Sequence, residues 1–197
     1  MKESAAPTKV RINKVQDRMI FLAPSVKLGQ ENEANLRDFD IGDILGQGAF
    51  GKVFKVVHKV SKRVFALKII DKKRIRKNSM EAQMQNEIKI MYSLNHPNVV
   101  RLFNHFEDDE SIYLVVEFAE EGQLMNKLKK VRKFPEAVAA GYLRDLVSAL
   151  GYIHNRTPPI LHRDIKPENL LMTADGKLKL GDFGWSNYGT EEERMTY

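Results

Sequence analysis

The chain of 197 residues contains no cysteine, a single tryptophan and no long uninterrupted apolar run. Without cysteine it can form neither disulfide bonds nor thiolate metal sites, and it has no cysteine nucleophile. Its apolar runs are short and broken by charged residues, so we expect no membrane insertion. The start, Met1 to Pro7, lacks the apolar core of a signal peptide, which predicts location in the cytoplasm, the nucleus or both.

Of the 197 residues, 43% are hydrophobic, and the chain carries a net charge of +6. This is enough apolar material for one sizeable domain or two small lobes. Residues 41–105 hold 13 basic and 4 acidic side chains, whereas residues 106–197 hold 12 and 16. The basic part could attract partners that carry phosphate, but solvated lysines on ordinary strands and helices explain it more simply. No stripe of basic and aromatic residues favours nucleic-acid binding, and we expect none.

The hydrophobic pattern divides the chain into a leader and two lobes. Residues 1–36 show no period of 2 or 3.6 and are predicted to be a flexible leader. Strands are expected from Phe39, after Gly51, over 63–70, 99–106 and 112–118, and helices over about 79–94, 123–130 and 135–154, with a hairpin turn at Asp175-Gly176. This order predicts an α+β protein, with a small sheet lobe over 37–119 and a mainly helical lobe over 120–197.

Three glycines, Gly46, Gly48 and Gly51, lie between the first two predicted strands. A dinucleotide-binding unit would continue into a helix at this point, but the residues after Gly51 favour a strand. A Walker A loop would need Ser or Thr after Gly51-Lys52, where this chain has Val53. What remains is a glycine-rich β-turn, in which the backbone can approach phosphate groups closely.

Two charged residues stand at positions that the pattern predicts to be buried. Lys68 lies in the third strand between apolar neighbours, and Glu87 shares a helix face with Met84, Ile88 and Met91. A buried charge is costly unless it is paired. Each residue alone could be an ordinary surface group, but together they predict one ion pair between Lys68 and Glu87.

The strongest chemical signal is the segment His162 to Asn169, followed by Asp182 in Asp-Phe-Gly. Asp164 can accept the proton of a hydroxyl group, and Lys166 can neutralise charge on a transferred phosphoryl group. Asn169 and Asp182 offer the hard oxygen ligands that Mg²⁺ prefers. The hairpin between them can return Asp182 to the loop that carries Asp164.

These motifs, in this order, resemble the protein kinases. The resemblance runs from Phe39 to the end of the chain, and Lys166-Pro167-Glu168 is similar to the serine/threonine type. Trp185 and Ser186, directly after Asp-Phe-Gly, resemble the Aurora family. The resemblance implies the protein-kinase fold, with a five-stranded antiparallel sheet and one helix in the first lobe. It also implies an incomplete second lobe, because a complete kinase continues well beyond Tyr197.

The resemblance also implies a role for each matching residue. The catalytic residues would be Asp164, Lys166, Lys68 and Glu87, and Asn169 and Asp182 would bind Mg²⁺. ATP would be held by the residues of the glycine turn, by Lys68 and by the residues around the adenine, which are Leu45, Gly46, Gly48, Gly51, Val53, Ala66, Glu117, Ala119 and Leu171. Thr196 matches the activation-loop threonine, whose phosphate would recruit Arg163. Gly181 departs from the family pattern, which predicts a looser backbone before Asp182.

The function that this resemblance implies is transfer of the ATP γ-phosphate to Ser or Thr hydroxyls of protein substrates. It further implies a mitotic role at the spindle, centrosome or other microtubule structures, and an activator protein that docks on the first lobe. The alternative is a truncated kinase that binds nucleotide or a partner without transferring phosphate.

Overall fold

A computed structural model describes residues 34–48 and 50–189. Most of the expected leader, residues 1–33, and the expected phosphosite Thr196 lie outside the described residues. The chain forms two compact units. Within the described residues, the first unit comprises residues 34–48, 50–78 and 103–116, and the second comprises residues 79–102 and 117–189.

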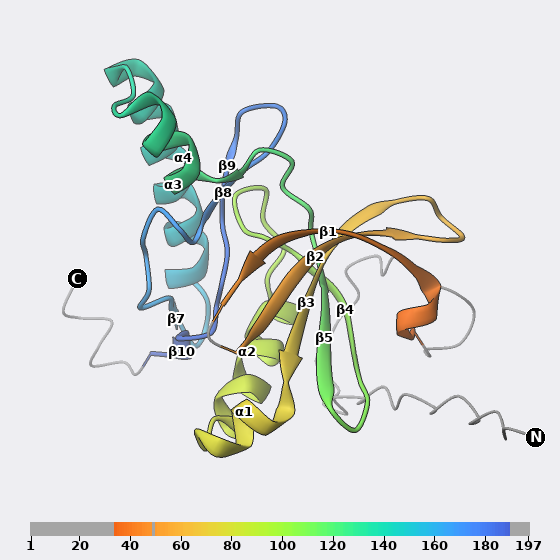
Figure 1. The fold of residues 1–197 in the computed structure, drawn as a ribbon. Helices are drawn as coiled ribbons and strands as arrows, with labels where there is room; N and C mark the ends of the chain where they lie inside the picture. The colour runs from red at the N-terminus through yellow and green to blue at the C-terminus, as the bar shows by residue number, and fades with distance from the viewer. Residues whose placement is uncertain (1–33, 49, 190–197) are drawn as a thin grey trace, which may run out of the picture. The chain divides into compact units, whose positions relative to one another are not determined.

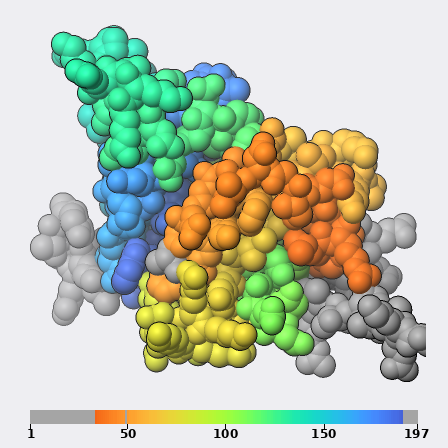
Figure 2. Space-filling model, in the orientation of Figure 1, coloured from red at the N-terminus to blue at the C-terminus, as the bar shows by residue number. Residues whose placement is uncertain are grey.

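The first unit is built on a five-stranded sheet with the order β1-β2-β3-β5-β4 (Figure 1). Its strands are β1 (Phe39–Gln47), β2 (Gly51–His58), β3 (Val64–Asp71), β4 (Leu102–Glu107) and β5 (Ser111–Val116). The pairs β1–β2, β2–β3 and β3–β5 are antiparallel. Strand β1 lies at the edge of the sheet, and most of its residues are exposed, as its orange surface in Figure 2 shows.

The register of β2 and β3 divides their side chains between two faces of the sheet. Val53 pairs with Lys68, and Phe54 pairs with Leu67. Because successive side chains of a strand point to opposite faces, Val53 and Lys68 share one face while Phe54 and Leu67 share the other. The second face carries the hydrophobic core of this unit, which consists of Ala34, Phe39, Val56, Phe65, Leu67, Phe106, Tyr113 and Val115.

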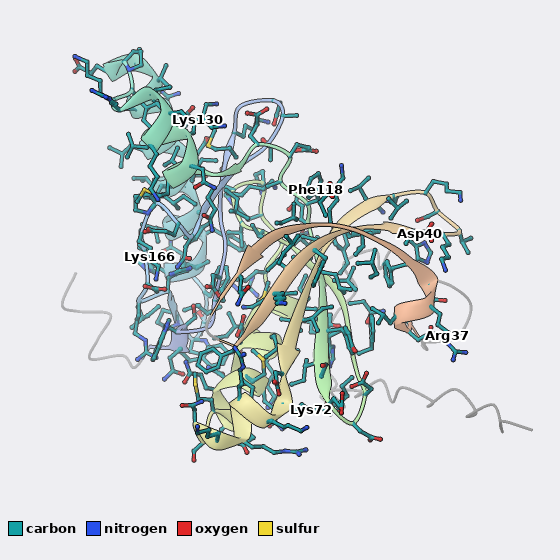
Figure 3. The ribbon with its side chains drawn as sticks, in the orientation of Figure 1. Arg37, Asp40, Lys72, Phe118, Lys130 and Lys166 are labelled. Carbon is teal, nitrogen blue, oxygen red and sulfur yellow. The ribbon has the colours of Figure 1, made fainter. Side chains whose placement is uncertain are left out.

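Two short helical segments border this sheet, and each is capped by a side chain. The 3-10 helix Leu36–Asp38 begins with a capping box between Asn35 and Asp38. Helix α1 (Lys72–Lys77) follows β3 directly, and the Asp71 carboxylate accepts hydrogen bonds from the N–H groups of its first turn. Lys72, labelled in Figure 3, donates to the Asp108 carbonyl at 2.5 Å and pairs with Glu107 at 2.9 Å.

The second unit combines helices with short strands. Its helices are α2 (Glu81–Ser93), α3 (Leu124–Val131) and α4 (Glu136–His154). Strands β6 (Gly122–Gln123), β8 (Leu170–Met172) and β9 (Leu178–Leu180) form one small sheet, and β7 (Ile160–Leu161) pairs with β10 (Asn187–Tyr188). These short strands place the loops between them, which carry Asp164, Lys166, Asn169 and Asp182.

The core of the second unit lies between α4 and the β8–β9 hairpin. Ala149 and Ile153 of α4 are completely buried, as are Met172 and Leu180 of the hairpin. The Asp145 carboxylate of α4 also accepts a 2.9 Å hydrogen bond from the Leu178 N–H. A helix side chain therefore fixes the start of β9, four residues before Asp182 of the Asp-Phe-Gly segment.

The structure confirms the α+β class and the five-stranded sheet of the first unit. The sequence reasoning did not predict α1 or the two-residue strands. The helix expected over about 79–94 is present as α2, although Asn78 is not part of its start. Asn78 ends α1 instead, donating from its side chain to the Arg74 carbonyl, and α2 begins after Met80 with no side-chain cap. Among the described residues, no helix is both long and apolar enough to span a membrane.

Candidate active site

The glycine turn between β1 and β2 belongs to the first unit. The Gly48 N–H donates to the Gly51 carbonyl at 2.9 Å and closes the turn. A Cβ on Gly51 would lie 1.8 Å from the Ile69 carbonyl oxygen, so only glycine fits this position. A Cβ on Gly46 or Gly48 would meet nothing within 4 Å. These two glycines therefore leave backbone uncovered by side chains, which is the property that a phosphate-binding turn needs.

Three predicted nucleotide residues, Val53, Ala66 and Lys68, share one face of the first unit's sheet with Val116. Ala66 pairs with Val116, and Val53 pairs with Lys68, so all four point to the face opposite the aromatic core. Ala66 is buried, and Val53 and Lys68 are half-buried. The face thus offers apolar side chains beside the Lys68 ammonium group, and Lys55, which pairs with Ala66, lies on the same face. Leu45, in β1, is 46% exposed, next to an irregularity in the β1–β2 register.

The catalytic loop of the second unit brings together Asp164, Lys166 and Asn169. The Lys166 ammonium lies 3.0 and 2.8 Å from the two oxygens of the Asp164 carboxylate. That hydrogen bond raises the pKa of Lys166, so the side chain stays protonated. The Asn169 amide donates to the Asp164 carbonyl at 2.8 Å and to Asp164 Oδ2 at 2.9 Å. The carboxylate is therefore held from both sides, and Figure 3 labels Lys166.

Asn169 and Asp182 fit a site for a divalent cation with few protein ligands. Because the amide nitrogen of Asn169 is used by Asp164, its Oδ1 faces away and accepts no hydrogen bond from a described residue. Asp182 is exposed. No cluster of three or more His, Cys, Asp or Glu suitable for a metal occurs in residues 34–48 and 50–189. Mg²⁺ suits this chemistry, because it usually keeps waters and phosphate oxygens as its remaining ligands.

His162 joins the catalytic loop to the Asp-Phe-Gly segment. Its Nε2 lies 2.9 Å from the Gly181 carbonyl, and its Nδ1 accepts from the Asp164 N–H at 3.3 Å. These partners require a neutral ring with the proton on Nε2. Burial lowers the pKa of His162, which agrees with that form. The ring also contacts the fully buried Phe183 edge to face, with the two centroids 4.9 Å apart.

The backbone before Asp182 is tightly fixed, contrary to the expectation that Gly181 loosens it. The Gly181 N–H donates to the Asn169 carbonyl at 2.8 Å, while its own carbonyl contacts His162. Asp182 has a φ of +54° and Arg163 a φ of +62°. Such left-handed backbone at residues other than glycine is concentrated at functional sites, where the surrounding contacts hold it.

Helix α2 contacts the segment after Asp182 through residues that sequence reasoning missed. The Gln83 side chain donates to the Gly184 carbonyl, and Asn86 donates to the Ser186 carbonyl at 3.2 Å. Glu87 is 4% exposed, and a Cβ on Gly184 would lie 3.5 Å from its carboxylate. The predicted burial of Glu87 is therefore confirmed. The spacing of residues 83, 86 and 87 on one helix face was the available signal.

The residues predicted to meet the adenine edge lie just after β5, in the second unit. The Glu117 N–H donates a hydrogen bond to the Arg101 carbonyl at 2.9 Å. The Glu117 carbonyl and the Ala119 N–H form no hydrogen bond with a described residue. One acceptor and one donor are therefore available, two residues apart, as recognition of an adenine edge requires. Leu171, in β8, is half-buried.

Arg163 and Trp185 connect the catalytic loop to the segment after Asp-Phe-Gly. Arg163 is exposed and donates from Nε to the Trp185 carbonyl at 2.9 Å. Trp185 itself is 55% exposed. Thr196, which the resemblance pairs with Arg163, lies outside the described residues, so that pairing remains a prediction. The Lys68–Glu87 ion pair also remains a prediction, since the two residues belong to different units.

The chain matches the protein kinase domain family over residues 39–197. It is 42% identical over 160 residues to an Aurora kinase of Dictyostelium discoideum, covering 81% of this chain and 41% of that protein. It is 45% identical over 159 residues to Aurora kinase B-A of Xenopus laevis, covering 81% and 44%.

A plant relative, the serine/threonine-protein kinase Aurora-1 of Arabidopsis thaliana, is 45% identical over 151 residues, covering 77% of this chain and 51% of the relative. The chain thus spans about half the length of the curated relatives that it matches. The family match covers the glycine turn, the catalytic loop and the Asp-Phe-Gly segment. The chain therefore belongs to the protein kinase domain family, and the relatives that it resembles within it are Aurora serine/threonine kinases.

Proposed function

We propose that this chain binds ATP with Mg²⁺ and transfers its γ-phosphoryl group to serine or threonine hydroxyls of proteins. The observation that carries the proposal is the Asp164 carboxylate, which Lys166 and Asn169 hold at 2.8 and 2.9 Å within one loop. Family membership and the similarity to Aurora kinases support the same activity.

In this proposal Asp164 orients the acceptor hydroxyl. Its carboxylate accepts the hydroxyl hydrogen while the oxygen attacks the γ-phosphorus and the bond to the β-phosphate oxygen breaks. The proton passes to Asp164, and ADP leaves with the electron pair of the broken bond. Lys166 is positively charged and within reach of the same carboxylate, so it can balance negative charge on the transferred group.

Asn169 and Asp182 would hold the metal in this scheme. When bound, Mg²⁺ would supply positive charge that neutralises the phosphate oxygens. Asn169 would present the Oδ1 atom that Asp164 leaves available, and Asp182 would present its carboxylate. Gly46, Gly48 and Lys68 would contact the phosphates, and Glu87 would orient Lys68. Leu45, Val53, Ala66 and Leu171 would enclose the adenine.

The resemblance to Aurora kinases extends the proposal to regulation and location. We propose phosphorylation of Thr196, with Arg163 as a partner of the phosphate, and an activator protein that docks on the sheet-containing lobe. A mitotic role at the spindle or centrosome follows from the same resemblance. Imaging of the tagged protein through mitosis tests this part, and a diffuse signal at every stage would contradict it.

Calorimetry of ATP binding with and without Mg²⁺ tests the nucleotide site. The full chain should bind ATP in a magnesium-dependent manner, and Asp182→Asn should weaken that dependence. Asp175→Asn is the matched control, because Asp175 is an exposed carboxylate in the β8–β9 turn and pairs only locally with Thr173 and Lys177. Magnesium dependence that survives intact in Asp182→Asn would place the metal elsewhere.

Phosphoryl transfer is tested separately with peptides that differ only in their acceptor. Labelled γ-phosphate should appear on the Ser and Thr peptides and be absent from the peptide whose acceptor is Ala. Asp164→Asn should lose this transfer while it still binds ATP, because the proposal places Asp164 at the hydroxyl and not at the nucleotide. Transfer at the normal rate by Asp164→Asn would overturn the role of this carboxylate.

A further inference from the structure

A buried lysine outside the catalytic loop makes a connection that the proposed mechanism does not use. Lys179, in β9, is 9% exposed. Its ammonium pairs with Glu117 Oε1 at 3.0 Å and donates to the Pro97 carbonyl at 2.6 Å. A lysine in this position is costly unless its charge is compensated. Both partners belong to the same compact unit as Lys179.

Glu117 is also held through the segment that follows α2. Its N–H donates to the Arg101 carbonyl at 2.9 Å, and its Oε2 accepts from the Arg101 N–H at 3.3 Å. With Lys179 on Oε1, Glu117 is fixed through its backbone and through both carboxylate oxygens. We call this group of Pro97, Arg101, Glu117 and Lys179 the Glu117 anchor.

The anchor rests on a hydrogen-bonded ladder that leads to the metal-binding segment. The Val100 N–H donates to the Leu180 carbonyl at 2.9 Å, and the Leu180 N–H donates to the Asn98 carbonyl at 2.8 Å. Val99 and Leu180 form a parallel bridge. Leu180 lies between Lys179 and the Gly181-Asp182 pair. The ladder therefore ties the residue at the adenine edge to β9, which ends two residues before Asp182.

We propose that Lys179 is a positioning residue for adenine recognition, which acts by holding Glu117 so that its free carbonyl faces the nucleotide base. This inference rests on the proposed ATP-binding function. It assigns Lys179 no contact with the phosphates or with the acceptor hydroxyl. Loss of Lys179 should therefore weaken binding of the adenine base and leave binding of the phosphate groups unchanged.

The test compares three probes with the full chain: ATP with Mg²⁺, adenosine, and inorganic tripolyphosphate with Mg²⁺. Lys179→Met should weaken the binding of ATP and adenosine about tenfold, the loss expected when a charge-assisted hydrogen bond no longer orders the site. Binding of tripolyphosphate should stay within about twofold, because phosphate contacts are unchanged. In a transfer assay the KM for ATP should rise while kcat at saturating ATP is kept.

Matched variants separate positioning from simple loss of structure. Lys177→Met removes another lysine of the same hairpin, one that is exposed and pairs with Asp175 at 3.4 Å, and it should change none of the three affinities. Lys179→Arg keeps the charge and should recover part of the loss. The losses of adenosine affinity caused by Glu117→Gln and Lys179→Met should not add in the double variant, because each substitution removes the same interaction.

The outcomes distinguish this inference from the proposed function. If the unmodified chain binds no ATP, the proposed function fails. If the chain binds ATP but Lys179→Met binds adenosine as well as the unmodified chain, the positioning role alone is overturned. An equal loss for adenosine and tripolyphosphate would also overturn it, since that indicates general disruption. If Lys179→Met does not fold, the binding of adenosine and tripolyphosphate is measured with Glu117→Gln instead. Normal adenosine binding by Glu117→Gln would then contradict the positioning role of Lys179.

Discussion

Asn169 donates two hydrogen bonds to Asp164, one to its backbone carbonyl at 2.8 Å and one to its carboxylate at 2.9 Å. The first bond fixes the loop, and the second fixes the orientation of the carboxylate. Using the amide nitrogen in this way turns the amide oxygen of Asn169 outward. One side chain thereby orients the proposed base and presents a ligand for the proposed metal.

Asn169→Asp should therefore impair phosphoryl transfer by about 100-fold or more, the usual cost of losing one preorganised donor. The variant replaces a donor with a second carboxylate 2.9 Å from Asp164. Repulsion between the two raises the pKa of one of them, so a proton is retained where a free carboxylate is needed. Steady-state kinetics of peptide phosphorylation measures the loss. Asn126→Asp, at an exposed position of α3, is the control and should keep normal turnover.

Lys68→Met should abolish measurable transfer while the protein remains folded. Lys68 is half-buried in β3 and pairs with Val53 of β2. Methionine has a side chain of similar length and packs well against apolar residues, so the fold should tolerate it. Circular dichroism and thermal unfolding check the fold, and a phosphorylation assay checks transfer. Lys52→Met provides the comparison, because Lys52 pairs with Ile69 and so points to the other face of the sheet. Normal turnover in Lys68→Met would remove Lys68 from the site.

Stability should fall as the pH is lowered from about 7 to about 5.5. Burial lowers the pKa of His162 and His105 below the ordinary value of 6.5, and the two residues are 2% and 5% exposed. The unfolded chain then binds more protons than the folded chain below pH 6.5, so acid favours unfolding. Each histidine contributes a slope of up to about 1.4 kcal/mol per pH unit between the two pKa values. Urea unfolding at several pH values measures the slope.

His105→Gln should make that slope shallower, because one of the histidines whose pKa is lowered by burial is removed. The comparison uses the change of unfolding free energy with pH and not its absolute value, so a general loss of stability does not affect it. An unchanged slope in His105→Gln would mean that His105 is not among the groups that titrate with unfolding.

Gly51→Ala should destabilise the first unit by about 3 kcal/mol or more, the range of severe backbone conflicts. A Cβ at this position would lie 1.8 Å from the Ile69 carbonyl oxygen, which belongs to the β2–β3 ladder and cannot move away cheaply. Gly141→Ala is the contrasting variant. Gly141 lies inside α4 with nothing within 4 Å of a Cβ, so alanine should stabilise by about 0.5 to 1 kcal/mol. Chemical denaturation of both variants measures the two changes in unfolding free energy, which should have opposite signs.

Patterns within single segments carried most of the sequence predictions. The alternation in β2 and β3 and the apolar face of α4 depend on neighbours in the chain, and the observed elements match them closely. The same holds for the catalytic loop, where Asp164, Lys166 and Asn169 are only a few residues apart. Residues this close in one loop need little tertiary information to be brought together.

Features that depend on distant partners were missed. Strand β7 exists only because Leu161 pairs with Asn187, and β6 only because Gly122 pairs with Met172. Gln83 looks like an ordinary helix residue until the Gly184 carbonyl is placed beside it. Asn78 is of a residue type that favours helix starts, and a helix does begin nearby at Glu81, but the Asn78 side chain satisfies the last turn of α1.

The exposed Trp185 gives this chain an intrinsic fluorescent probe. It is the single tryptophan in the sequence, it stands three residues after Asp182, and its carbonyl is held by Arg163. Its emission therefore reports on one defined segment, without a background from other indole rings. Since the chain also lacks cysteine, one introduced thiol would accept a dye at a single chosen position. Energy transfer between that dye and Trp185 would then follow the Asp-Phe-Gly segment in solution without further changes to the protein.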